Sequence, residues 1–140
     1  MERAAHLVPQ GVVSLLSALT LHGIGTQMPR SVWIALDRSK NRKPPRVRGM
    51  PVEFVWFSGA AFTDGQEEHH IDGAKIRVYS PAKTVADLFK YRGKIGIDVA
   101  VEALREGLRE RRFTPAEVER FAQVCRVSAV MKPYLQALTG

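Results

Sequence analysis

The sequence predicts an α+β fold, with one small antiparallel sheet of about four strands between an N-terminal helix and a C-terminal run of about three or four helices. The hydrophobic period changes from helical to strand-like near Val32 and becomes helical again after Ser80. Strands that follow one another, rather than alternating with helices, are typical of α+β folds. With 140 residues, 45% of them hydrophobic, the chain is expected to form a single domain over residues 1–140.

The N-terminal helix is predicted from a segment without Asp, Glu, Lys or Arg, between Ala4 and Pro29. Proline, glycine and hydroxyl side chains interrupt this segment, so we expect neither a membrane span nor a secretory signal. Apolar residues recur at the spacing of one helix face, namely Val12, Leu15, Leu16 and Leu19. Gly23 is expected to end the helix, with His22 in a structural role in its last turn.

Two strands are predicted at Val32 to Leu36 and Val52 to Phe57, because both segments are short, rich in β-branched and aromatic residues, and bounded by turn residues. A hairpin follows. Asp72-Gly73 lies between two further runs and favours a two-residue type I′ turn, which would pair Glu68 with Arg77.

The adjacent histidines His69 and His70 precede that turn and are candidate metal ligands. Neighbouring residues of a strand point to opposite faces, so the two imidazoles cannot easily share one ion. We therefore interpret the segment as a surface hairpin, and the sequence predicts no metal and no cofactor.

Helix starts and stops are clearest in the last part of the chain. Ser80 before Pro81 is the pattern of a helix cap, and the segment Arg92 to Lys94, with its glycine, is expected to end that helix. A second helix should follow from Gly96 to Arg109, where apolar residues again recur on one face.

The third helix of this run is predicted by Thr114, Pro115 and Glu117, the pattern of a capping box. Pro133 is expected to kink or restart the last helix. The one cysteine, Cys125, lies in an apolar helical stripe, which favours a buried and inert thiol. The absence of paired cysteines is typical of a reducing cytoplasm.

Positive charge is concentrated in one segment. The chain has a net charge of +7, and Arg30 to Arg48 carries +6 of it, opposed only by Asp37. The polar composition and Pro44-Pro45 predict an extended basic loop between two strands, able to follow a phosphate backbone. The loop residues that we expect to contact nucleic acid or a partner are Arg38, Lys40, Arg42, Lys43, Arg46 and Arg48.

A second basic cluster, at the link between the first two C-terminal helices, consists of Lys90, Arg92 and Lys94. No aromatic residues are interleaved in the basic loop for base stacking, so any DNA contact should be non-specific. A solvated loop is the alternative interpretation.

No catalytic residue is predicted. The phosphate-binding, dinucleotide-binding, zinc-protease, paired-cysteine and nucleophile-elbow motifs are all missing. A small metal-dependent nuclease would need converging acids, and Asp87 and Asp98 are the candidates, although helix-surface or cap positions account for both.

Three segments together resemble the C-terminal domain of the AbiEi family, the antitoxins of type IV abortive-infection toxin–antitoxin systems. They are Gly11 to Leu36, Ile76 to Arg109 and Val124 to Leu138. Their most specific parts are SALTLHGI at Ser17 to Ile24, S-P-x-K-T-V-A-D at Ser80 to Asp87, and K-I-G-I-D-V-A at Lys94 to Ala100. The similarity extends over nearly the whole chain, and the order and spacing of the segments carry it.

The resemblance implies a non-enzymatic bacterial antitoxin and transcriptional regulator that counters a toxin of nucleotidyltransferase-like fold. In the family an N-terminal winged helix-turn-helix reads the promoter, and we expect that module to be absent here because only eleven residues precede Val12. The expected partners are the DNA backbone and the toxin, with no membrane. An alternative is a protein-interaction domain whose basic face meets an acidic toxin surface without binding DNA.

Overall fold

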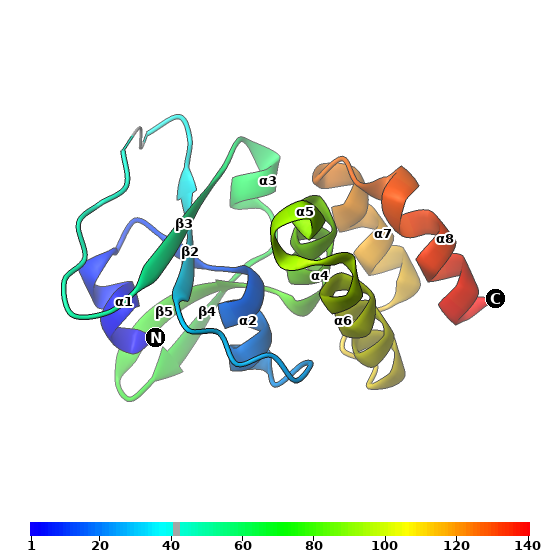
Figure 1. Ribbon diagram of the computed structural model, residues 1–140, viewed down its shortest axis with the longest axis horizontal. Helices are drawn as coiled ribbons and strands as arrows, with labels where there is room; N and C mark the ends of the chain where they lie inside the picture. The colour runs from blue at the N-terminus through cyan, green and yellow to red at the C-terminus, as the bar shows by residue number, and fades with distance from the viewer. Residues whose placement is uncertain (41–42) are drawn as a thin grey trace.

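A computed structural model describes residues 1–40 and 43–140 and has an α+β architecture (Figure 1). The strands are β1 (Val12–Val13), β2 (Val32–Asp37), β3 (Val52–Phe57), β4 (Gln66–Ile71) and β5 (Ala74–Tyr79). The helices are α1 (Glu2–Leu7), α2 (Leu15–His22), α3 (Ala60–Thr63), α4 (Pro81–Lys90), α5 (Arg92–Ile95), α6 (Ile97–Arg109), α7 (Pro115–Val124) and α8 (Ser128–Thr139). The predicted fold class is confirmed.

The five strands form one mixed sheet, in the order β3-β2-β1-β5-β4. The β1–β2 and β4–β5 pairs are antiparallel, whereas β1–β5 and β2–β3 are parallel. The expectation of an antiparallel sheet of about four strands was therefore wrong in strand number, which is five, and in strand direction, which is mixed.

The additional strand is β1, which occupies the centre of the sheet. Val13 pairs with Ile34 of β2 on one side and with Val78 of β5 on the other. We had assigned Val12 to the N-terminal helix, but that helix begins only at Leu15. Two β-branched residues are too few to show a period of their own, and their burial between two strands decides their conformation.

The parallel pairing of β2 with β3 explains the length of the basic loop. Parallel neighbours require a crossover connection of about a dozen residues or more, whereas a hairpin turn suffices for antiparallel ones. Residues 38–51 provide that crossover. The loop is therefore part of the sheet topology as well as a carrier of charge.

The predicted hairpin is confirmed in its turn and its register. Asp72 and Gly73 both have positive φ, 50° and 79°, as a type I′ turn requires. Glu68 pairs with Arg77 across the strands, and the Lys75 ammonium lies 3.1 Å from the Glu68 carboxylate.

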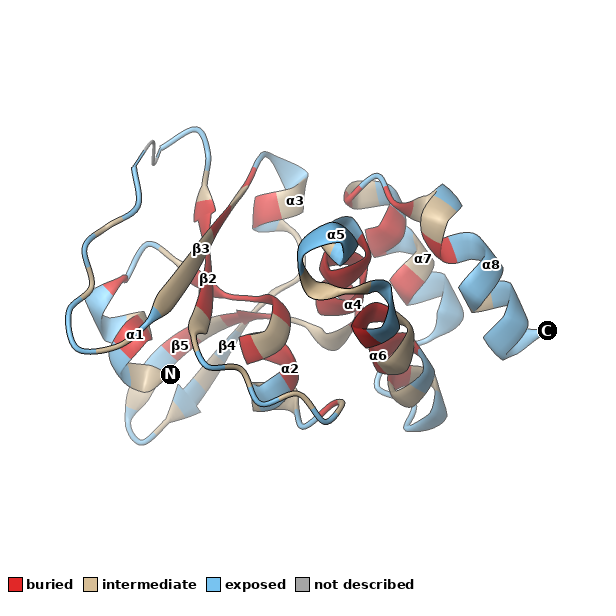
Figure 2. Cartoon of the chain, viewed as in Figure 1, coloured by how far each residue is buried: buried red, intermediate tan, exposed pale blue. Residues whose placement is uncertain are grey.

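Helix α4 lies between the sheet and the C-terminal helices (Figure 1). Its N-cap is Ser80, whose hydroxyl accepts a hydrogen bond from the Lys83 amide, as predicted. All residues from Ala82 to Phe89 are buried, so α4 is enclosed on every side (Figure 2). This enclosure brings two charged α4 residues, Lys83 and Asp87, into the core.

Three expectations about the C-terminal helices had different outcomes. Thr114 and Glu117 form the reciprocal capping box that their spacing predicts. The positive φ at the helix link belongs to Gly96, at 115°, and not to the predicted Arg92–Lys94 segment, which forms the short helix α5. Helix α8 runs through Pro133 as one element, so the helix does not restart there, and the expected kink stays a prediction.

Candidate phosphate-binding pocket

A pocket of about 560 Å³ opens where the end of β3 and α3 meet the C-terminal ends of α4 and α7. Its buried lining residues are Phe57, Asp87 and Cys125. Residues from four separate elements reach this place because α4 packs against α7, and β3 continues directly into α3. We call it the basic pocket because three basic side chains line it.

Three exposed basic residues line the basic pocket: Arg38, Lys90 and Arg126. Arg38 begins the β2–β3 crossover, Lys90 ends α4, and Arg126 follows the C-cap of α7. The structure thus joins one residue from each of the two predicted basic clusters. Among the described residues of the lining, Asp87 is the one acid.

Asp87 is engaged in a buried ion pair. The Lys83 ammonium donates to both carboxylate oxygens of Asp87 at 2.8 Å, and the side chains are 0% and 2% exposed. The Cys125 thiol donates to Asp87 Oδ1 at 3.3 Å. The ammonium also lies 3.9 Å from the ring centre of Tyr79 and 4.5 Å from that of Phe57. The negative charge facing the basic pocket is therefore already compensated.

Burial governs the protonation of the groups below the basic pocket. Desolvation raises the pKa of the Asp87 carboxyl, and the adjacent Lys83 charge opposes that effect. Burial, together with the nearby Asp87, also raises the pKa of the Cys125 thiol. Cys125 is 3% exposed, in agreement with the predicted buried thiol.

Aromatic side chains also reach the basic pocket, although none is interleaved in the basic loop itself. Trp56 of β3 and Tyr91 at the end of α4 line it together with Arg38. The Tyr91 hydroxyl donates to the Trp56 carbonyl at 3.5 Å, which connects the two elements. Sequence reasoning missed both residues, because only the folded chain places them beside the basic loop.

The other predicted contact residues that the structure describes lie outside the basic pocket. Four of these residues are exposed in the β2–β3 crossover: Lys40, Lys43, Arg46 and Arg48. Arg42 falls outside the described residues.

At the helix link, Arg92 donates to the Phe89 carbonyl at 2.8 Å, and Lys94 lies 3.4 Å from the Glu53 carboxylate. Lys94 also lies 5.4 Å from the ring centre of Trp33. Both side chains therefore have partners within the chain, and their contact with nucleic acid or a protein partner stays a prediction.

The two acids considered for a nuclease differ in their surroundings. Asp87 was interpreted as a helix-surface residue, but it is buried and bonded to Lys83, because α4 has no exposed face. Asp98 is exposed in the first turn of α6. Among the described residues, neither belongs to a group of three side chains spaced to hold a metal ion.

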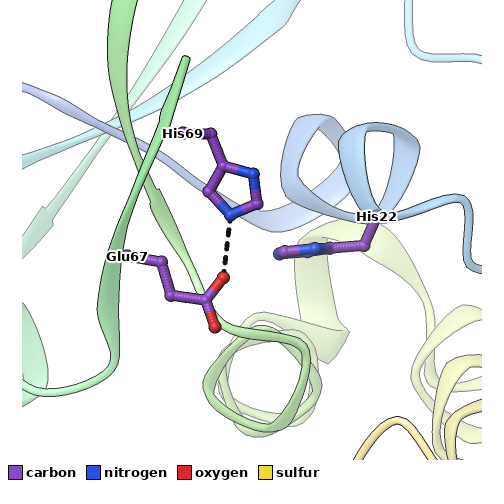
Figure 3. A group of neighbouring side chains, drawn as sticks. All are labelled: His22, Glu67 and His69. Atoms are coloured by element: carbon purple, nitrogen blue, oxygen red, sulfur yellow. Dashed lines mark hydrogen bonds and ion pairs between the residues drawn. The ribbon is translucent and has the colours of Figure 1, made fainter. Parts of the chain in front are cut away.

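Such a group does exist elsewhere, where it was not predicted. His22, Glu67 and His69 converge from α2 and β4 (Figure 3). His69 meets Glu67, two residues before it on the same strand face, and not its neighbour His70. A period-two pattern in the sequence indicates the Glu67–His69 pair, but nothing in it indicates His22.

The chain matches no protein-family model and no curated protein. Across the part of the chain that the structure describes, no helix combines the length and apolar character needed to cross a bilayer.

Proposed function

We propose that this chain is the antitoxin and regulatory domain of a type IV toxin–antitoxin system, acting in the bacterial cytoplasm without catalysis and contacting the DNA backbone through the basic pocket. The antitoxin assignment is supported by the resemblance of three ordered segments to the AbiEi C-terminal domain. The DNA contact is supported by one observation, the convergence of Arg38, Lys90 and Arg126 on a single pocket.

The charge balance of the basic pocket suits an anion. Three exposed cations face it, and the one lining acid is neutralised by Lys83 behind it. A phosphodiester that binds there would release the counterions condensed on it, which favours binding at low salt.

The basic crossover extends this positive surface. Arg38 is its first residue, and exposed lysines and arginines continue along it as far as Arg48. Phosphate contacts of this kind position a protein on nucleic acid without reading its sequence. Trp56 and Tyr91 add aromatic surface on which an unpaired base can stack, again without sequence preference.

The DNA contact is tested by charge reversal in the basic pocket. Arg38→Glu combined with Lys90→Glu should abolish binding to a short duplex at low salt. Wild-type affinity should fall linearly on a log–log plot against salt, with a slope of about −0.9 per phosphate contacted. Arg105→Glu combined with Arg109→Glu makes the same charge change on the exposed face of α6 and is the matched control. Equal losses of DNA affinity in the two double variants would show that binding depends on net charge alone and would contradict the proposal.

The antitoxin role needs a separate assay. Co-expression of the chain with a nucleotidyltransferase-like toxin from the same genome should restore the growth of cells that the toxin arrests. Failure of the wild-type chain to do so would contradict this part of the proposal. Loss of rescue in the Arg38/Lys90 variant, with DNA binding retained, would favour direct contact with the toxin instead.

A further inference from the structure

Three potential metal ligands from distant parts of the chain meet at one side of the sheet. His22 lies in the last turn of α2, and Glu67 and His69 alternate on β4 so that both point to the same face. One ligand atom from each side chain lies within 4.8 Å of the ligand atoms of the other two. Figure 3 shows the three side chains pointing toward one another.

We propose that His22, Glu67 and His69 bind one divalent transition-metal ion, and that zinc fits this donor set best. Two imidazole nitrogens and one carboxylate oxygen are a common zinc ligand set, with bonds of about 2.0–2.2 Å and water in the fourth position. Tetrahedral ligand atoms at such bond lengths are about 3.3–3.6 Å apart. The ligand atoms, which lie within 4.8 Å of one another, therefore reach this spacing by rotation of the side chains.

His22 is held in a tautomer that suits a ligand. Its Nε2 lies 2.8 Å from the backbone carbonyl oxygen of Tyr79. A carbonyl oxygen can only accept, so Nε2 carries the proton and Nδ1 keeps its lone pair. Metal-binding histidines usually donate their second ring N–H to a carbonyl or carboxylate in this way, which fixes the orientation of the ring.

Glu67 and His69 are already in contact in the absence of metal. Nε2 of His69 donates to Oε1 of Glu67 at 2.9 Å. In the bound state the ion takes the place of the shared proton and bonds to both atoms, and the His69 ring carries its one proton on Nδ1 instead, so that the ligand is a neutral imidazole. The His22 and His69 rings lie edge to face with their centres 5.6 Å apart, so both rings border the same space.

The surroundings allow an ion to enter. The side chains of His69 and Glu67 are 34% and 42% exposed. A neighbouring cation is Arg112, which donates to the backbone carbonyl of His22 at 2.8 Å and is 4.0 Å from the Glu110 carboxylate. Glu110 partly offsets the Arg112 charge, and Glu67 supplies the negative charge at the site itself.

A bound ion would join α2 to the β4–β5 hairpin at the edge of the sheet. These elements belong to distant parts of the sequence, so a metal link between them should raise the stability of the whole chain. Metal binding does not depend on the proposed antitoxin function. The zinc titration and the toxin-rescue assay can therefore succeed or fail independently.

The experiment titrates the chelator-treated full chain with Zn²⁺ alone by calorimetry, and with Co²⁺ by visible absorption. We expect one zinc per chain, a rise in melting temperature with zinc, and the intense visible bands of four-coordinate cobalt. Absence of stoichiometric zinc binding would overturn the proposal. A weak cobalt spectrum of the six-coordinate type, measured on the wild-type chain, would also overturn the proposal.

Variants then locate the site. Glu67→Gln and His69→Gln should each weaken zinc binding by more than about tenfold. His70→Gln is the matched control, because His70 is the exposed neighbour on the opposite strand face and should leave binding unchanged. Circular dichroism verifies that each variant is folded. Equal weakening by His70→Gln and His69→Gln, or zinc binding that survives loss of both Glu67 and His69, would overturn the assignment.

Discussion

Substitution of Asp87 by asparagine tests the buried ion pair directly. The two side chains are nearly isosteric, so the change removes a charge without opening a cavity. Lys83 is fully buried, and both of its hydrogen bonds to Asp87 measure 2.8 Å. Removing one partner of a buried pair typically costs about 3–5 kcal/mol, because the other charge is left uncompensated.

The surroundings of Lys83 place this variant near the lower end of that range. The ammonium keeps its contacts with the rings of Tyr79 and Phe57, at 3.9 Å and 4.5 Å from the ring centres. Each such contact contributes about 0.5–2 kcal/mol. The side-chain amide that replaces the carboxylate can also accept one hydrogen bond through its carbonyl oxygen. We therefore expect a loss of about 3 kcal/mol in the free energy of unfolding.

Urea unfolding followed by tryptophan fluorescence measures the loss, since Trp33 and Trp56 both lie in the sheet. Glu68→Gln provides the control, because the Glu68–Lys75 pair is 3.1 Å long with side chains 56% and 60% exposed. Its loss should cost less than about 1 kcal/mol. The double variant Lys83→Met with Asp87→Leu should recover most of the stability lost in Asp87→Asn. An Asp87→Asn penalty no larger than that of Glu68→Gln would refute the reasoning.

Two further predictions concern Cys125 and Gly107. Because the pKa of the Cys125 thiol is raised from its ordinary 9.0, the folded chain holds a proton that the unfolded chain loses above that pH. The free energy of unfolding should fall as pH rises above 9.0, and Cys125→Ala should remove this part of the pH dependence. The thiol of the native chain should react slowly with an aromatic disulfide at pH 8. A rate as high as that of the denatured chain would contradict the burial of Cys125. A Cβ at Gly107 would overlap the Phe113 ring, so Gly107→Ala should destabilise the chain by about 1–3 kcal/mol in urea unfolding. Gly93→Ala, where a Cβ meets nothing within 4 Å, is its control and should be neutral or stabilising.

Local patterns in the sequence were sufficient to predict much of the framework. The Ser80 cap, the Thr114 capping box and the Asp72-Gly73 turn with its register all appear as expected. Each depends on contacts between residues close together in the chain, and hydrogen-bonding chemistry over three or four residues determines them.

The candidate sites could be predicted only in part, because their members come from distant segments. Arg38 and Lys90 were expected contacts, but Arg126 and Trp56 join them only through the packing of α7 and β3 around α4. No spacing rule connects these residues.

By itself, the sequence determined the α+β class, the N-caps of α4 and α7, the extent of α6, the hairpin register and the excess of positive charge. Only the tertiary structure decided the sheet order, the strand at Val12–Val13, the burial of Lys83 with Asp87, and the meeting of His22 with Glu67 and His69. The physical reason is the same in each case. Periodicity and capping report the local environment of a residue, whereas strand neighbours, buried ion pairs and ligand clusters depend on which distant surfaces pack together.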